Sequence, residues 1–289
     1  MDGQLWRELY RRIRRCARRL PKPRRRFVYS DAQIAAMFFW AAWFEKPQSW
    51  ACRRSSYNGL FRPRRLPSVS EFNKRIRSWR FARLMRLLEV DSRGETDGLR
   101  RLILDARPLV VGGCSKDPDA KAGRVCGGFG RGYRLHTLTA EGGVTFAWEV
   151  TSLREAESEV ARRLLTQAPA GALVVADGNY DRGPLYQIAA ERGVVFLARP
   201  RRNAGCGHRP QNPHRLAAIR QWNLNPTYYA RLRSEIERIF GQQTSVAGGL
   251  LPLPPWVRRL DRVRRWVQAK LILHHLRLSL RNQPNDAAA

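Results

Sequence analysis

Acidic side chains are scarce in this sequence of 289 residues, which has 24 Asp and Glu residues against 54 Lys and Arg residues. The formal net charge is +30, and a field of that size calls for a polyanionic partner. Most of the cations are Arg, whose planar fork matches phosphate better than the ammonium group of Lys does. Nucleic acid is therefore the first candidate partner. Ribosomal proteins and histones share this bias, so the charge defines only the class of partner.

Cysteine and long apolar runs are also rare. The five scattered cysteines contain no CxxC pair, so neither a disulfide framework nor a cysteine-rich zinc site is indicated. The apolar run over residues 34–44 has eleven residues, whereas a helix needs about 20 to cross a bilayer. We therefore predict a buried helix there and no membrane partner. Because the Arg-rich start lacks a signal-peptide pattern, we expect a cytoplasmic, nucleoid-associated protein.

A short segment late in the chain combines Cys206, His208 and His214. These residue types can bind a metal ion, but the surrounding sequence is rich in Pro, Gly and Asn. That composition is typical of a solvated loop. We favour the loop over a metal site.

The first 95 residues have the pattern of a helical domain. Residues 1–26 carry eleven basic and two acidic side chains, with apolar residues at helical spacing. Ser30 stands where it can cap a helix through the apolar run, and Ser68 and Glu71 have capping-box spacing ahead of a further amphipathic helix. We therefore predict a helical domain over residues 1–95.

The helix that follows Ser68 carries the cations Lys74, Arg75 and Arg77 beside its apolar side. Such a helix can bury one face and offer cations to DNA. We predict a basic DNA-binding domain in which residues 66–88 contain a helix-turn-helix-like unit, with these three residues at the DNA. A solvated basic face is the simpler alternative.

After a loop-like boundary at residues 91–99, the periodicity becomes that of an α/β domain over residues 96–282, followed by a tail at 283–289. The expected strands are 101–111, 133–139, 144–151, 172–176 and 194–198, and the expected helices are 155–165, 184–192 and a long one from 226 onward. The run at 172–176 is continuously apolar, which predicts burial on both faces. This is the element order of an RNase H-like mixed-sheet domain.

Three carboxylates stand out by position. Asp105 lies within an apolar strand, Asp177 follows a second apolar strand, and Glu237 lies in the late helix. A carboxylate at the end of an apolar strand is costly unless it is solvated, paired or bound to metal. Three converging carboxylates can hold two Mg²⁺ ions, which prefer oxygen ligands.

Each carboxylate has a simpler interpretation when taken alone. Asp177 before a glycine is typical of a strand-ending turn, Asp105 can pair with a neighbouring arginine, and Glu237 can be a surface charge on its helix. The combination of the three is what indicates a metal site.

Four segments of the sequence, residues 104–105, 130–136, 176–181 and 233–241, resemble the DDE transposases of bacterial insertion sequences. The resemblance covers most of residues 66–282. It implies that Asp105, Asp177 and Glu237 are the catalytic triad and bind Mg²⁺ or Mn²⁺. It also implies two-metal cleavage of double-stranded DNA at terminal inverted repeats, strand transfer into target DNA, and a homo-oligomer assembled on DNA.

The resembling helix also carries residues that the family associates with DNA ends. Arg233 matches the family pattern, and Arg238 is interpreted as a further phosphate contact. The family has a Tyr three residues before this Arg and a Lys seven residues after the Glu, whereas this sequence has Ala230, beside Tyr229, and Thr244. We expect Tyr229, Arg233 and Arg238 to contact DNA.

Several alternatives remain open at this point. Glu235 flanks the apolar face of the helix as Glu237 does, so the choice of Glu237 depends on the resemblance. Because Ala230 and Thr244 depart from the family pattern, a non-catalytic DNA-binding protein derived from a transposase is one alternative function. A nuclease or resolvase of the same fold is another.

The glycine-rich residues 127–132 lack the preceding strand and following helix of a phosphate-binding loop. We predict a basic hairpin that leads into the strand at 133–139. His136 lies on that strand and is expected near Asp105.

Overall fold

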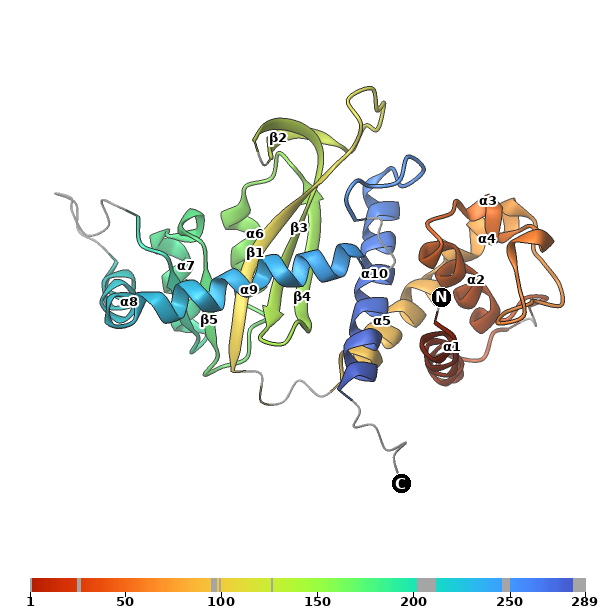
Figure 1. The fold of residues 1–289 in the computed structure, drawn as a ribbon, viewed down its shortest axis with the longest axis horizontal. Coiled ribbons are helices and arrows are strands. Elements are labelled where there is room, and N and C mark those ends of the chain that lie inside the picture. The colour runs from red at the N-terminus through yellow and green to blue at the C-terminus, as the bar shows by residue number, and fades with distance from the viewer. Residues whose placement is uncertain are drawn as a thin grey trace. The chain divides into compact units, whose positions relative to one another are not determined.

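The computed structural model describes residues 2–24, 27–94, 98, 100–125, 127–201, 212–245 and 250–282. The chain forms two compact units. The helical unit comprises Met1–Gly94, Gln243–Leu250 and Arg265–Ala289, and the sheet unit comprises Glu95–Gln242 and Leu251–Arg264. Figure 1 labels their helices and strands along the chain.

The helical unit is built from several helices around the apolar helix α2 (Asp31–Trp43). Its elements are α1 (Gly3–Arg18), α2 (Asp31–Trp43), α3 (Gln48–Ala51), the 3₁₀ turn η1 (Arg54–Ser56), α4 (Val69–Ile76), α5 (Trp79–Arg93) and most of α10 (Leu260–Arg281). Nine consecutive residues of α2, from Ile34 to Ala42, are buried, which confirms the predicted buried helix. No helix of the described residues is both long and apolar enough to cross a bilayer.

Two helix starts in this unit are defined by serine caps. The hydroxyl of Ser30 accepts a hydrogen bond from the backbone N–H of Gln33 at 3.1 Å, and that of Ser68 accepts from the N–H of Glu71 at 3.2 Å. Each bond satisfies a backbone donor that the first helical turn leaves free. Both predicted helix starts are thereby confirmed.

The last helix, α10, contributes to the core of the helical unit from Arg265 onward. The Lys270 Nζ donates to the backbone oxygen of Ala42 at 2.9 Å, and the Gln268 side-chain amide donates to Glu89 at 2.7 Å. The compact units therefore differ from the expected ranges 1–95 and 96–282, because α10 from Arg265 onward is part of the helical unit, with residues 269–276 all buried. The expected tail at 283–289 lies outside the described residues.

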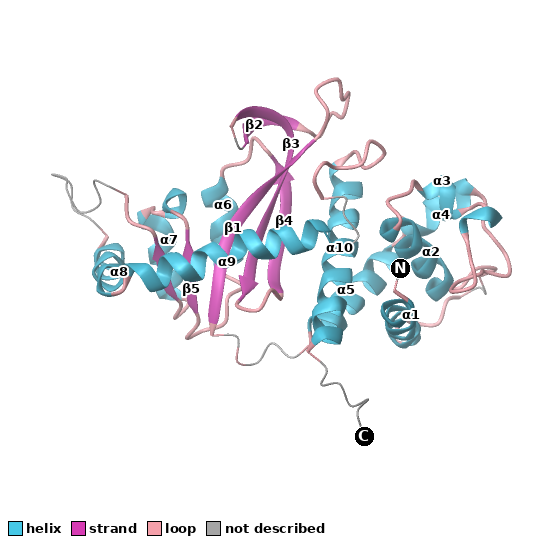
Figure 2. Cartoon of the chain, in the orientation of Figure 1, coloured by secondary structure: helices cyan, strands magenta, loops and turns pink. Residues whose placement is uncertain are grey.

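In its described residues, the sheet unit contains one mixed sheet of six strands. They are β1 (Arg101–Val110), β2 (Lys121–Val125), β3 (Gly128–Ala140), β4 (Thr145–Ser152), β5 (Leu173–Ala176) and β6 (Val195–Ala198). The strands β2, β3 and β1 pair antiparallel, β1, β5 and β6 pair parallel, and β4 pairs antiparallel with β3. Figure 2 shows the long strands β1 and β3 along the middle of this sheet. This mixed sheet confirms the expected RNase H-like fold.

Helices cover both faces of the sheet. Figure 1 shows α9 (Pro226–Ser245) crossing one face, and an arginine of α9 reaches Asp105. The opposite face carries α6 (Glu157–Leu165) and α7 (Gly183–Glu191), and Arg134 of β3 pairs there with Glu157. Side chains alternate between the faces of a strand, so Asp105 projects on the α9 side, whereas Ala106 projects on the α6 side.

Most expected elements of this unit are confirmed, with two additions. The hairpin predicted from the glycine-rich residues is formed by β2 and β3, although β2 itself was not expected. A further helix, α8 (Pro213–Leu224), precedes α9. The long helix expected from residue 226 onward ends at Ser245, and α10 is a separate helix.

Candidate active site

Two carboxylates, Asp105 and Asp177, lie side by side on neighbouring strands, and we call them the paired carboxylates. The parallel register of β1 and β5 places Leu104 opposite Ala176, so the next residue of each strand is an aspartate. Asp105 accepts a hydrogen bond from the N–H of Ala106, and Asp177 accepts one from the N–H of Gly178, each at 2.7 Å. The adjacency expected from sequence is therefore present.

The helix α9 adds Arg233 to this pair. Its guanidinium lies 3.5 Å from the Asp105 carboxylate and 3.5 Å from that of Glu237, so one cation links the two acids. The Glu237 side chain is 72% exposed. Glu235, on another side of the helix, has one carboxylate oxygen buried without a hydrogen-bond partner among the described residues.

The environment of Asp105 disfavours its ionised form. Burial raises the pKa of this carboxyl to about 6, while the N–H of Ala106 and the Arg233 guanidinium act in the opposite direction. The negative charges of Asp177 and Glu157 raise the pKa further. A poorly hydrated carboxyl beside a second carboxyl is an arrangement that a bound cation stabilises.

The described residues contain no group of three His, Cys, Asp or Glu side chains close enough together to hold a metal ion. Two members of the predicted triad are brought together, and the third, Glu237, is connected to them through Arg233. The paired carboxylates have the oxygen donors that Mg²⁺ prefers, so they fit part of a magnesium site. Cys206 and His208 lie outside the described residues.

The predicted DNA contacts on α9 have different surroundings. Tyr229 is half-buried and packs against Trp222, with the ring centroids 5.5 Å apart. Arg238 is exposed, and no hydrogen bond or ion pair of its side chain with a described residue is present. Arg233 is held by the acids described above.

In the helical unit, Lys74 and Arg77 are exposed, as a DNA contact requires. Arg75 is different, because its side chain is only 7% exposed and forms a 2.7 Å ion pair with Asp31. It also donates to the backbone oxygen of Tyr29 at 2.9 Å. The expectation that Arg75 contacts DNA is therefore corrected: this arginine joins α4 to the start of α2.

His136 is buried on β3, opposite Ala106 in the strand register. It projects on the α6 side of the sheet, away from the face that carries Asp105. One ring nitrogen lies 3.1 Å from the Thr151 hydroxyl. Burial lowers the pKa of His136 to about 3, so the ring is neutral at physiological pH.

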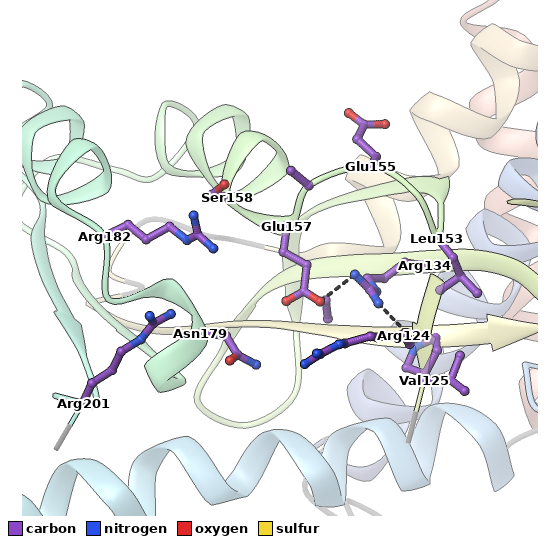
Figure 3. Close-up of a pocket in the computed structure, with 13 residues that line it drawn as sticks. Arg124, Val125, Arg134, Leu153, Glu155, Glu157, Ser158, Asn179, Arg182 and Arg201 are labelled. Atoms are coloured by element: carbon purple, nitrogen blue, oxygen red, sulfur yellow. Dashed lines mark hydrogen bonds and ion pairs between the residues drawn. The ribbon is translucent and has the colours of Figure 1, made fainter. Parts of the chain in front are cut away.

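A cavity that opens on the α6 side of the sheet, at the segments that follow the paired carboxylates, was not foreseen from the sequence. It has a volume of about 590 Å³ and begins at Ala106, directly after Asp105, and at Asn179, two residues after Asp177. Figure 3 shows side chains of separate segments around it, including Arg124, Arg134, Glu157, Arg182 and Arg201. No local motif could have revealed it, because its walls come from distant parts of the chain.

The mixed sheet, with Asp105 within β1 and Asp177 directly after the neighbouring parallel strand β5, defines an RNase H-like α/β domain. A family model described as "Transposase DDE domain" matches residues 96–251, which is more than half of the chain. The chain belongs to this family. No curated protein and no solved structure matches it.

Proposed function

We propose that this protein cuts DNA at the ends of an insertion sequence and joins those ends to target DNA. The observation that carries the proposal is the register of β1 and β5, which aligns Asp105 with Asp177 in a domain of the DDE family. The helix α9 runs over the same place and presents Glu237 through Arg233.

The metal ligands that we propose are Asp105, Asp177 and Glu237. These carboxylates would hold two Mg²⁺ or Mn²⁺ ions, which would supply activation of the attacking oxygen and stabilisation of the leaving oxygen of the phosphodiester. The raised pKa of Asp105 supports this role, because a cation favours the carboxylate form. The exposed Glu237 can join the paired carboxylates by rotation of its side chain about flexible torsions.

Arg233 has two roles in this proposal. Without metal, it balances the charge of Asp105 and Glu237. With DNA present, the same guanidinium can bind a phosphate oxygen near the scissile bond, since charge-assisted bonds from Arg to phosphate are strong. Arg238, exposed one helical turn further along, would bind the neighbouring backbone, and Tyr229 would line the DNA path beside Trp222.

We propose that the helical unit supplies DNA recognition and much of the affinity. Exposed cations follow α1 and extend to Lys74 and Arg77; those of α1 are Arg7, Arg11, Arg14, Arg15 and Arg18. Phosphate contacts of this kind bind without reading the sequence. Transposition joins two DNA ends, so we further propose that two or more copies assemble on the terminal inverted repeats.

The test uses a plasmid that carries the DNA flanking this gene on both sides. Purified full-length protein with Mg²⁺ or Mn²⁺ should release the element at defined ends and produce joined products. Asp105→Asn and Asp177→Asn should each abolish cleavage while leaving DNA affinity almost unchanged, because affinity comes from many arginine contacts. Asp261→Asn changes an exposed aspartate of the same unit and serves as the matched control.

Each outcome discriminates among the functions under consideration. Cleavage without joined products would favour a nuclease or resolvase of the same fold. Binding to the ends without cleavage at any metal concentration would favour a non-catalytic DNA-binding protein. Full cleavage by Asp105→Asn, or in excess EDTA, would overturn the metal mechanism. Replacement of Glu235 and Glu237 by Gln, one at a time, tests the third ligand.

A further inference from the structure

The cavity beside the paired carboxylates has more positive than negative groups that are free to bind a ligand. Its two glutamates are already paired: Glu157 with Arg134 at 2.6 Å and Glu155 with Arg163 at 2.6 Å. The guanidinium groups of Arg124 and Arg182 are exposed and make no hydrogen bond or ion pair with a described residue. The unbalanced charge of the cavity is therefore cationic.

A further arginine connects the cavity to the catalytic turn. Arg201 Nε donates to the backbone oxygen of Gly178 at 3.1 Å, and Gly178 directly follows Asp177. Arg201 is an exposed residue. In Figure 3, Arg182 and Arg201 approach the cavity from one side and Arg124 approaches from the other, with Asn179 between them. A ligand that reaches all three would lie next to Asn179, two residues after Asp177.

The size and lining of the cavity restrict its occupant. A volume of about 590 Å³ lies within the range of about 300–1,000 Å³ for small-ligand pockets. That volume accommodates one or two nucleotides. A duplex, whose major groove alone is about 12 Å wide, does not fit. Arginines recognise phosphate through paired donors, and the Asn179 amide offers a donor and an acceptor to a base edge.

We infer that this cavity binds one or two unpaired nucleotides of the DNA strand that adjoins the scissile phosphate. Arg124 and Arg182 bind the phosphodiester groups, and Arg201 holds the turn that carries Asp177 against the same strand. The inference rests on the proposed function, since it assigns a place to the strand that the paired carboxylates would cut. It accounts for a cationic cavity beside them that the metal mechanism alone does not require.

The experiment measures binding in EDTA, so that the chemistry of the paired carboxylates plays no part. The probes are fluorescein-labelled pentathymidylate and a hairpin duplex of matched length. The double variant Arg124→Gln/Arg182→Gln is compared with Arg192→Gln/Arg220→Gln, which removes the same charge from two exposed arginines of the same unit. Thermal unfolding verifies that both variants fold as the parent does.

For pentathymidylate, the slope of log affinity against log salt should become shallower by about 1.4 in the cavity variant, because each lost phosphate contact removes about 0.7. The affinity of the cavity variant, expressed relative to that of the parent, should therefore be about 25-fold lower at 0.1 M salt than at 1 M salt. The control variant should show a much smaller change. Duplex binding should respond equally to both variants.

Chemical protection locates the bound strand. Phenylglyoxal modifies exposed arginines, and mass spectrometry should show that pentathymidylate protects Arg124 and Arg182 but leaves Arg192 and Arg220 reactive. Equal losses of affinity in the two variants, or equal protection at all four positions, would overturn the inference. Protection that persists while Asp105→Asn still cleaves DNA would refute only the proposed catalytic role. Cleavage that depends on Asp105 without protection would refute only the cavity.

Discussion

Replacement of Asp105 by Asn should stabilise the metal-free protein at neutral pH. Burial is the main reason that the pKa of Asp105 rises from 3.8 to about 6 in the folded chain. This is a rise of about two pKa units, and each unit corresponds to about 1.4 kcal/mol, which gives an upper value of about 3 kcal/mol. The side chain keeps 16% of its exposure, so we expect a gain of about 1–3 kcal/mol in the free energy of unfolding.

The gain should depend on pH in a defined direction. Below about pH 3.8, Asp105 is protonated in both the folded and the unfolded chain and has no effect. Between about pH 4 and pH 6 the folded chain binds more protons than the unfolded chain, so the free energy of unfolding of the parent falls as pH rises. Asn does not titrate. The advantage of the variant should therefore grow across this interval and stay constant above it.

Urea titrations, combined with hydrogen exchange of the amides of β1 and β5, measure this difference in the sheet unit. Asp261→Asn is the control, because its carboxylate is exposed. Addition of Mg²⁺ or Mn²⁺ should stabilise the parent more than the variant and narrow the gap. If the difference in free energy of unfolding between variant and parent does not change between pH 4 and pH 7, the pKa of Asp105 is not raised by burial and the reasoning is refuted. A variant that is less stable than the parent at pH 7 would refute it as well.

Three further predictions concern folding. Arg75→Ala should lower the free energy of unfolding by about 3 kcal/mol or more, since it leaves Asp31, whose side chain is 13% exposed, without one partner. Lys74→Ala, at an exposed position, should change it by less than about 0.5 kcal/mol. Equal values for the two variants in urea titrations would contradict the burial of Arg75. Gly132→Ala should lower the free energy of unfolding by about 1–3 kcal/mol, because a Cβ there would lie 2.3 Å from a backbone oxygen of β1. Gly113→Ala is the control, since a Cβ at that position meets nothing within 4 Å. Thermal unfolding of the two variants measures the difference. Ser68→Ala should lower the free energy of unfolding by about 1 kcal/mol, because the helix cap is removed, and Ser68→Asp should restore it. Unfolding followed by circular dichroism that shows no destabilisation of Ser68→Ala would argue against the cap.

The sequence was most informative where periodicity and burial agree. The apolar run before Asp177 predicted a strand covered on both faces, and β5 is such a strand, with α9 and α7 on opposite sides of the sheet. Asp105 and Asp177 were predicted to converge, and the register of β1 and β5 brings these two together. Helices and strands whose own pattern of apolar side chains determines their burial could be predicted from the sequence.

Other elements are defined by their partners, and these were missed. The strand β2 has only two apolar residues among Lys121–Val125, and it exists because its backbone pairs with the start of β3. The cavity is likewise a product of segments far apart in the chain. Contacts between segments that are far apart in the sequence cannot be predicted from local sequence patterns.

Arg75 shows the same limit for a single side chain. In the sequence it is one of several cations beside Lys74 and Arg77, and nothing local separates it from them. Its partner, Asp31, lies 44 positions earlier, and the packing of α4 against α2 brings the two together. Exposure, which decides whether a cation can reach DNA, follows from tertiary contacts.

The assignment of α10 to the helical unit has a consequence for how the protein is made. The chain passes between the two units at residues 94/95, 242/243, 250/251 and 264/265, so the helical unit begins before the sheet unit in the sequence and is completed after it. Domains commonly fold in order as they leave the ribosome, but here the core around α2 lacks Lys270 and its neighbours until translation has passed the whole sheet unit. A nonsense mutation after residue 242 would spare all three carboxylates of the proposed triad and still deprive the N-terminal helices of α10.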